Sequence, residues 1–155
     1  MGARGVSHRQ AECPVARTVD VIGDRWSLLI IRDAFDGIRR FSELQRNLGL
    51  AKNILATRLR ELVAQGILEV VPAADGSAYH EYALTDRGRE LFGVIVALRK
   101  WGEAHLFDED EPRSALLDVE TGRPVELQVT NAAGQPISAG DAFVRKVAAT
   151  PARAG

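Results

Sequence analysis

The stretch FSELQRNLGLAKNILATRLRELVAQG, residues 41–66, contains two amphipathic segments separated by a short turn. Leucines recur at helical spacing in both segments, as Leu44 and Leu48 in the first and as Leu55, Leu59 and Leu62 in the second. This spacing predicts two helices that bury one face each. Gly49 ends the first pattern and Gly66 ends the second, where glycine favours a helix end. Two helices joined by a short glycine-containing turn indicate a helix-turn-helix motif.

Capping residues predict where the neighbouring helices begin. Ser42 and Gln45 have the spacing of a capping box, so we expect Ser42 to cap the first helix of the motif. Asp24 is expected to cap the preceding segment, RWSLLIIRDAF, which is apolar on most of its circumference. That segment therefore predicts the central buried helix, with Trp26 in the core. Upstream, Pro14 suits the first position of a helix over 14–22, and Cys13 is then its cap.

The segment after the motif predicts a β-hairpin followed by a long helix. Two β-like runs, residues 67–71 and 79–84, flank the turn signal Asp75-Gly76. Thr85 is expected to cap one continuous helix over residues 86–106. This helix is more apolar than a small domain needs to cover one face, which indicates a partner chain.

These elements predict five segments along the chain. We expect a disordered N-terminus (1–11), a winged helix-turn-helix domain (12–107), an acidic linker (108–113), a β-rich extension of three short strands (114–148) and a frayed C-terminus (149–155). The fold class is α+β, mainly α with a small β component.

The charge distribution favours a phosphate-binding surface, although the net charge of −1 does not. Residues 37–60 contain six basic residues and one acid, whereas residues 106–155 contain eight acids and five bases. A basic face on a nearly neutral chain is typical of a nucleic-acid-binding module. The alternative interpretation is an ordinary solvated helix face.

The leucine stripe of residues 52–66 also predicts which side chains point toward DNA. We expect Asn53, Ala56 and Thr57 to contact base edges in the major groove. Five further residues are expected to contact phosphates, namely Arg39, Arg40, Ser42, Lys52 and Arg60. For Arg46 and Arg58, a DNA contact and an ordinary surface role are equally compatible with the sequence.

Several functional classes lack their sequence signals. One cysteine and three distant histidines predict neither a disulfide framework nor a metal site, and no cofactor is expected. No apolar run reaches the roughly 18 residues of a membrane span. No catalytic triad, phosphate loop or nucleotide fingerprint occurs, so an enzyme is not expected. Residues 1–10 lack a secretory signal, and we expect a cytoplasmic protein.

Several segments together resemble the HxlR-type family of winged helix-turn-helix transcription regulators. They are CP, IGDRWSLLIIRDAFDGIRRFSELQRNLG, LATRLRELVAQGIL, EYALTDRGREL and LRKWGE, within residues 13–105. The resemblance implies a homodimer held by the first and last helices of the domain, a pseudo-palindromic operator in double-stranded DNA and no catalytic activity. Two features depart from the family pattern: Ala51 stands where a serine cap is common, and the hairpin over residues 67–84 contains no Lys or Arg.

Cys13 leads to two interpretations, a reactive sensor and a partly buried structural cap that never reacts. The positive end of a helix favours a reactive thiolate, Arg17 one turn later adds to this effect, and Glu12 opposes it. The resemblance implies that a cysteine at this position can sense oxidants or electrophiles, which predicts a redox-responsive repressor. The alternatives are a regulator whose small-molecule effector binds near the dimer interface or the C-terminal extension, and a protein-interaction module that binds no DNA.

Overall fold

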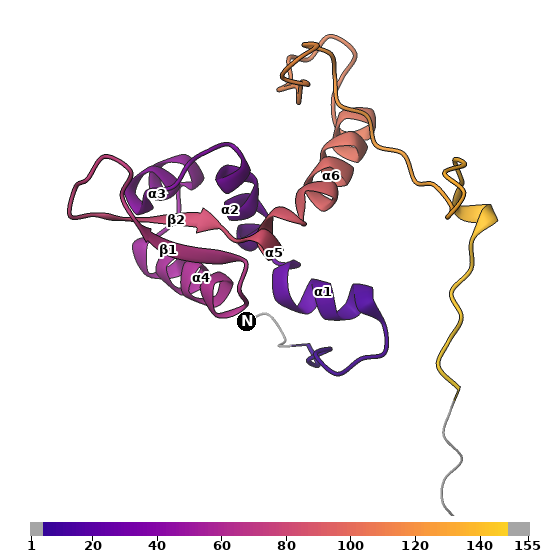
Figure 1. Ribbon diagram of the computed structural model, residues 1–155, viewed down its shortest axis with the longest axis horizontal. Coiled ribbons are helices and arrows are strands. Elements are labelled where there is room, and N and C mark those ends of the chain that lie inside the picture. Colours follow the sequence, from indigo (N-terminus) through magenta and orange to yellow (C-terminus); the bar gives the residue numbers. More distant parts are fainter. Residues whose placement is uncertain (1–4, 149–155) are drawn as a thin grey trace, which may run out of the picture. The chain divides into compact units, whose positions relative to one another are not determined.

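The computed structural model describes residues 5–148, which divide into two units at Trp101 and Gly102. Six helices, two strands and one 3₁₀ turn make up these residues (Figure 1). They are α1 (Pro14–Ile22), α2 (Arg25–Phe35), α3 (Phe41–Leu48), α4 (Lys52–Ala64), β1 (Leu68–Pro72), β2 (His80–Leu84), α5 (Asp86–Arg89), α6 (Phe92–His105) and η1 (Ala139–Asp141).

The core of the first unit forms around α2, which contacts α3, α4 and β2. Ile30 and Ile31 of α2 are fully buried, which confirms α2 as the central helix. The predicted leucine stripe of α4 is also confirmed, since Leu55, Leu59 and Leu62 are at most 1% exposed. Trp26 is partly buried and packs against this core. Burial of these aliphatic side chains provides the main stabilisation of the unit.

Two of the predicted caps form as expected. The Asp24 carboxylate accepts a hydrogen bond from the Ser27 N–H at 2.9 Å, and α2 begins at the next residue after Asp24. The Thr85 hydroxyl accepts from the Gly88 N–H at 3.0 Å at the start of α5. Each cap provides a partner for an N–H group that the helix itself leaves unpaired.

The capping box at Ser42 was wrong. Helix α3 begins at Phe41, with Arg40 as its N-cap residue and without a side-chain cap. The Arg40 carbonyl already accepts the Leu44 N–H at 3.0 Å, so Ser42 lies inside the first turn. A serine at that position cannot bond back to the helix start as a cap does.

The predicted hairpin is confirmed, with β1 shifted by one residue and β2 beginning one residue later than expected. Strands β1 and β2 pair antiparallel, from Leu68 opposite Leu84 to Pro72 opposite His80. The turn contains Gly76 at φ 75°, a conformation that suits glycine. The β2 residue Tyr82 also donates its N–H to the Arg39 carbonyl at 2.8 Å, so the hairpin is attached to the segment before α3.

The expected continuous helix over residues 86–106 was wrong, because it divides into α5 and α6 at Glu90 and Leu91. A tight bond from the Leu91 N–H to the Gly88 carbonyl, at 3.1 Å, ends the first segment. Gly88 also approaches Ile67, the residue before β1, and a Cβ built on Gly88 would lie 2.2 Å from the Ile67 carbonyl oxygen. This approach requires glycine and fixes α5 against the start of the hairpin.

The three strands expected after residue 113 do not form. The described part of the extension contains two isolated β-bridges, Leu117 with Pro124 and Thr130 with Pro136, and the turn η1. No side chain from 104 to 148 is buried, so no apolar layer stabilises a sheet there. Residues 149–155, expected to fray, lie outside the described residues.

The segment before α1 contacts that helix, although we expected residues 1–11 to be disordered. The Ser7 hydroxyl donates to the Asp20 carboxylate at 3.1 Å, and the Arg17 Nε donates to the Ala11 carbonyl at 2.5 Å. Residues 1–4 lie outside the described part of the chain.

Candidate nucleic-acid interface

Hydrogen bonds hold the turn between α3 and α4. Gly49 has a left-handed backbone, with φ 65°, and its N–H donates to the Gln45 carbonyl at 2.9 Å. The Gln45 side-chain amide donates to the Leu50 carbonyl at 3.3 Å, and the Leu50 side chain is buried. These contacts fix the position of α4 relative to α3.

A buried carboxylate ties α3 to α2. Asp33 is 1% exposed, and its two oxygens accept from Asn47 Nδ2 at 2.7 Å and from Arg32 Nη2 at 2.8 Å. A buried charge is stable only when it is paired and hydrogen-bonded, as here. Sequence reasoning missed Asp33, for which the available signal was a single acid inside an otherwise apolar helix.

Helix α4 carries the three predicted base contacts and two of the predicted phosphate contacts. Asn53, Thr57 and Arg60 are exposed on the side away from the leucine stripe, whereas exposed Lys52 and half-buried Ala56 lie on its flank. The Thr57 hydroxyl donates to the Asn53 carbonyl at 2.9 Å. Its lone pairs therefore remain available as hydrogen-bond acceptors, whereas its proton is engaged within the helix.

Both helices of the motif begin without a side-chain cap. The N-cap residue is Ala51 for α4 and Arg40 for α3, and neither side chain caps its helix. Ser42 is exposed in the first turn of α3. N–H groups at an uncapped helix start can donate to an external anion such as a DNA phosphate.

The structure separates Arg58 from the other basic residues. Its guanidinium lies 3.0 Å from the Glu61 carboxylate and 3.6 Å from that of Asp24. These ion pairs give Arg58 a role within the domain, between α4 and the start of α2. Arg46 is exposed on α3.

Arg39 and Arg40 form a cluster with two acids of the hairpin, which we call the wing cluster (Arg39, Arg40, Asp75 and Glu81). Arg39 Nε lies 3.1 Å from Glu81, whose side chain is 9% exposed. The Arg40 guanidinium contacts Asp75 and lies 3.8 Å from Glu81. The two predicted phosphate-binding arginines thus lie beside the hairpin, where they balance the charge of its acids Asp75 and Glu81.

The wing cluster and its turn affect the ionisation of Asp75. The backbone N–H of Ser77 donates to Asp75 at 2.9 Å, and with Arg40 nearby it lowers the pKa of Asp75 to about 2. In turn, hydrogen bonding to Asp75 raises the pKa of Arg40. Sequence reasoning identified Asp75 as part of a turn signal but not its pairing with Arg40, because the two residues are 35 positions apart and no local pattern connects them.

A hollow of about 480 Å³ lies between the start of α3 and the wing. It is lined by Arg40, Phe41, Ser42, Tyr79 and His80. The Arg40 guanidinium lies over the Tyr79 ring, 5.9 Å from its centroid, which orients the cation at the edge of the hollow. Two predicted phosphate contacts, Arg40 and Ser42, therefore face the same space.

Cys13 is exposed at the start of α1. It is the N-cap residue, with an extended backbone, and its carbonyl accepts the Arg17 N–H at 3.2 Å. The Arg17 side chain donates to the Ala11 carbonyl, so its Nε is engaged by the segment that precedes the thiol.

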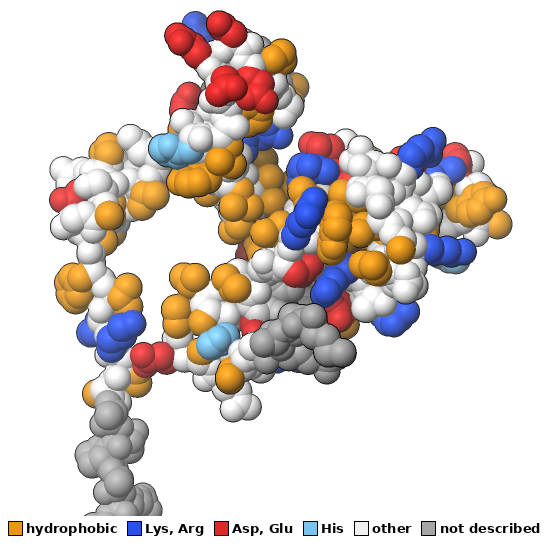
Figure 2. Space-filling view, turned by 180° about the vertical axis from the view of Figure 1, so that it is seen from behind, with side chains coloured by type: hydrophobic (Ala, Val, Ile, Leu, Met, Phe, Trp, Pro, Cys, Tyr) orange, Lys and Arg blue, Asp and Glu red, His pale blue; other side chains and the backbone are white. Residues whose placement is uncertain are grey.

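Apolar side chains remain exposed on α1 and α6. Val15 and Val19 of α1 are 69% and 57% exposed, and Leu98 of α6 is 50% exposed. Figure 2 shows hydrophobic side chains gathered along α6. Between these two helices lies an apolar groove of about 380 Å³, lined by Val15, Val19, Val94 and Leu98 among others.

Residues 5–148 contain no cluster of three or more His, Cys, Asp or Glu side chains placed to hold a metal ion. In that same range, no helix has the length and apolar content that crossing a bilayer takes.

The chain is similar to several regulators whose structures or sequences are known. The crystal structure of PA1607, a candidate transcription factor, is 54% identical, covers 92% of this chain and 100% of its own, and superimposes with a TM-score of 0.85. The redox regulator HypR in its oxidized form is 35% identical over 60% of this chain and 97% of its own, with a TM-score of 0.55. The uncharacterized HTH-type transcriptional regulator Rv3095 of Mycobacterium tuberculosis is 45% identical over 106 residues, 68% of this chain and 67% of its own.

The family profile of HxlR-like helix-turn-helix proteins matches residues 21–110, which include α2 to α6 and the wing. The family and the relatives named above are transcription regulators and not enzymes. The expected winged helix-turn-helix architecture is confirmed by the same comparisons. The chain therefore belongs to the HxlR-like helix-turn-helix family and is a DNA-binding transcription regulator of the helix-turn-helix type.

Proposed function

We propose that the protein is a homodimeric repressor that binds a pseudo-palindromic operator in the cytoplasm. The observation that carries this proposal is the outward face of α4, whose polar side chains Asn53, Thr57 and Arg60 are exposed. A major groove admits one helix, and an adjacent wing can follow the backbone.

In this proposal the contacts divide by position along the interface. Asn53, Ala56 and Thr57 lie in the first half of α4 and contact base edges. Phosphates are bound by Lys52 and Arg60 of α4, by Arg39 before α3, and by Arg40 and Ser42 at the hollow. The start of α3 supports a phosphate at Ser42, because this helix start has no side-chain cap and Ser42 is exposed in its first turn.

The exposed apolar faces of α1 and α6 support a homodimer. Val15, Val19 and Leu98 border one apolar groove, and such a groove is normally covered in a functional assembly. A two-fold dimer presents two α4 helices about one turn of DNA apart, which requires a pseudo-palindromic operator.

We further propose that Cys13 senses oxidants or electrophiles. Its exposed thiol at the start of α1 supports access by a peroxide or a quinone. A peroxide would oxidise the thiolate to a sulfenic acid with release of water or alcohol, and a second Cys13 thiol would then displace water to give an intersubunit disulfide. Similarity to HypR, itself a redox regulator, is consistent with this proposal.

Selection of bound fragments from genomic DNA tests the proposed function. A shared pseudo-palindromic motif near promoters supports the repressor. If no sequence is enriched, sequence-specific binding is contradicted.

A substitution tests the proposed sensor. The variant Cys13→Ser and the wild type are exposed to a peroxide and to a quinone, and their release of DNA is compared. Release of DNA by both forms to the same extent would show that Cys13 is not the sensor.

A further inference from the structure

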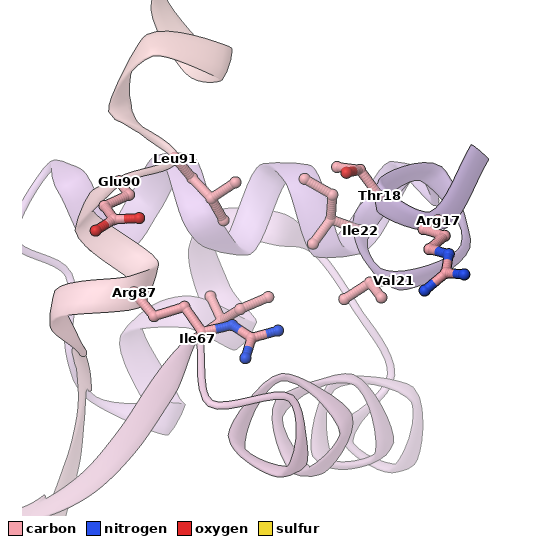
Figure 3. A pocket seen from close by; sticks show the side chains of 8 residues that line it. All are labelled: Arg17, Thr18, Val21, Ile22, Ile67, Arg87, Glu90 and Leu91. Carbon is pink, nitrogen blue, oxygen red and sulfur yellow. The ribbon is translucent and has the colours of Figure 1, made fainter. Parts of the chain in front are cut away.

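A second pocket, of about 380 Å³, lies between α1 and the segment that holds α5 and the start of the hairpin (Figure 3). Its apolar floor is formed by Val21 and Ile22 of α1, Ile67 before β1 and Leu91 between α5 and α6. The volume lies within the range of small-molecule sites, which combine an apolar lining with a few polar groups.

Two arginines and one acid stand at the edge of this pocket. Arg87 of α5 is exposed, and Figure 3 shows it extending past Ile67 in the direction of Val21. Within residues 5–148 its guanidinium has no ion-pair partner. Arg17 uses its Nε for the Ala11 carbonyl, which leaves its terminal nitrogens as donors. With Glu90 included, the pocket has a charge of +1.

We propose that this pocket binds a small monocarboxylate with an apolar body, of which an aromatic carboxylate is the simplest example. The carboxylate pairs with the Arg87 guanidinium, whose fork of donors suits a two-oxygen anion. The apolar body covers Val21, Ile67 and Leu91. Glu90 disfavours ligands with two negative charges, and the apolar floor disfavours inorganic anions.

The pocket is connected to the end of the helix that we propose reads DNA. Arg87 lies on α5, and Thr85 at the start of α5 donates its hydroxyl to the Gly66 carbonyl at 2.5 Å. Gly66 follows α4 after a single residue, and Ile67 belongs to the pocket floor. A ligand that bridges α1 and α5 therefore acts on the junction after α4. This regulatory part rests on the proposed function, whereas binding itself does not.

Calorimetry on the full chain without DNA tests the binding. The probes are benzoate, acetate and benzamide, which separate the carboxylate from the apolar body. We expect benzoate to bind about tenfold more tightly than either of the others, since each lacks one half of the recognition. Arg87→Gln should weaken benzoate binding by about tenfold, as expected for loss of a charge-assisted bond. The matched control Arg46→Gln removes an equal charge from α3 and should bind benzoate as the wild type does.

Three results would overturn the proposal: no binding of benzoate, equal affinity for benzoate and acetate, or equal affinity of Arg87→Gln and the wild type. The last result would assign any binding to another surface, such as the groove between α1 and α6. A second titration measures DNA affinity with and without saturating benzoate. A change of about fivefold or more supports the regulatory part, and no change overturns it. If no DNA binds, the proposed function fails while the calorimetric result stands.

Discussion

The wing cluster leads to a prediction about Glu81, whose carboxylate is the buried centre of the cluster. Glu81 lies 3.1 Å from Arg39 and 3.8 Å from Arg40, and it accepts the Ala74 N–H at 3.4 Å. Glu81→Gln keeps the size of the side chain and removes its charge. We expect the wing to lose its attachment to the arginines.

The contacts of Glu81 limit how much stability Glu81→Gln can remove. A hydrogen bond to a charged group contributes roughly 1.5–3 kcal/mol when shielded. Both arginines are more than a third exposed, at 44% and 34%, so solvent screening reduces the contribution. We therefore expect a loss of about 1 kcal/mol, which corresponds to about 4 °C in Tm for a unit of this size.

Thermal and urea unfolding measure this loss, with Glu69→Gln as the matched control. Glu69 is an exposed residue of the same hairpin, on β1, and its replacement should change Tm very little. Equal Tm values for Glu81→Gln and Glu69→Gln would refute the reasoning. DNA affinity provides a second measurement. Without Glu81, the arginines would no longer be held in one orientation toward the phosphates, so Glu81→Gln should weaken DNA binding and Glu69→Gln should not.

Three further predictions concern the fold and the ionisation of the wing. Leu59→Ala removes a fully buried side chain from the α4 stripe and should destabilise the protein by about 2–5 kcal/mol in urea unfolding, and a smaller loss would mean that the core collapses around it. Gly88→Ala should lower Tm because its Cβ would lie 2.2 Å from the Ile67 oxygen, whereas Gly93→Ala, which meets no atom within 4 Å, should not. The Asp75 carboxyl should titrate by NMR with a pKa of about 2. Its stabilising effect should then be complete above about pH 4 and be lost as the pH falls through this folded-state pKa. A titration midpoint near 3.8 would contradict the contacts with Ser77 and Arg40.

The sequence predicted the elements that depend on local signals. Asp24 and Thr85 cap helices as their positions indicate, and the spacing of Leu55, Leu59 and Leu62 placed the buried face of α4. These features depend on contacts within a few residues. The Asp75-Gly76 turn likewise placed the hairpin to within one residue.

Features that depend on distant parts of the chain were not predictable in this way. The break before α6 occurs where Gly88 approaches Ile67 closely, a contact that no helical pattern reveals. The pairing of Arg40 with Asp75 requires the hairpin to fold back on α3. Residues 114–148 have β-like runs, but a strand also needs a neighbour and an apolar layer, and sequence patterns carry neither.

The same distinction applies to the candidate site. The spacing of α4 predicted that Asn53, Thr57 and Arg60 share an exposed face, and the structure places them there. The sequence did not predict that Arg39 and Arg40 pair with acids of the wing. Nor did it predict that Asp33 anchors α3 through Asn47. Residue type and helical period are sufficient for the first statement, and only tertiary structure supplies the others.

The central claim is that the outward face of α4 binds the operator. The salt dependence of DNA binding tests this claim most directly. Affinity for a selected operator is measured by fluorescence anisotropy across a salt series for the wild type, Arg60→Gln and the control Arg58→Gln, whose guanidinium pairs with Glu61 and Asp24. We expect a steep loss of affinity with salt, and a slope reduced by about 0.9 for each phosphate contact that Arg60→Gln removes. Arg58→Gln should keep the wild-type slope. Equal slopes for Arg60→Gln and the wild type, or no binding at low salt, would contradict the account.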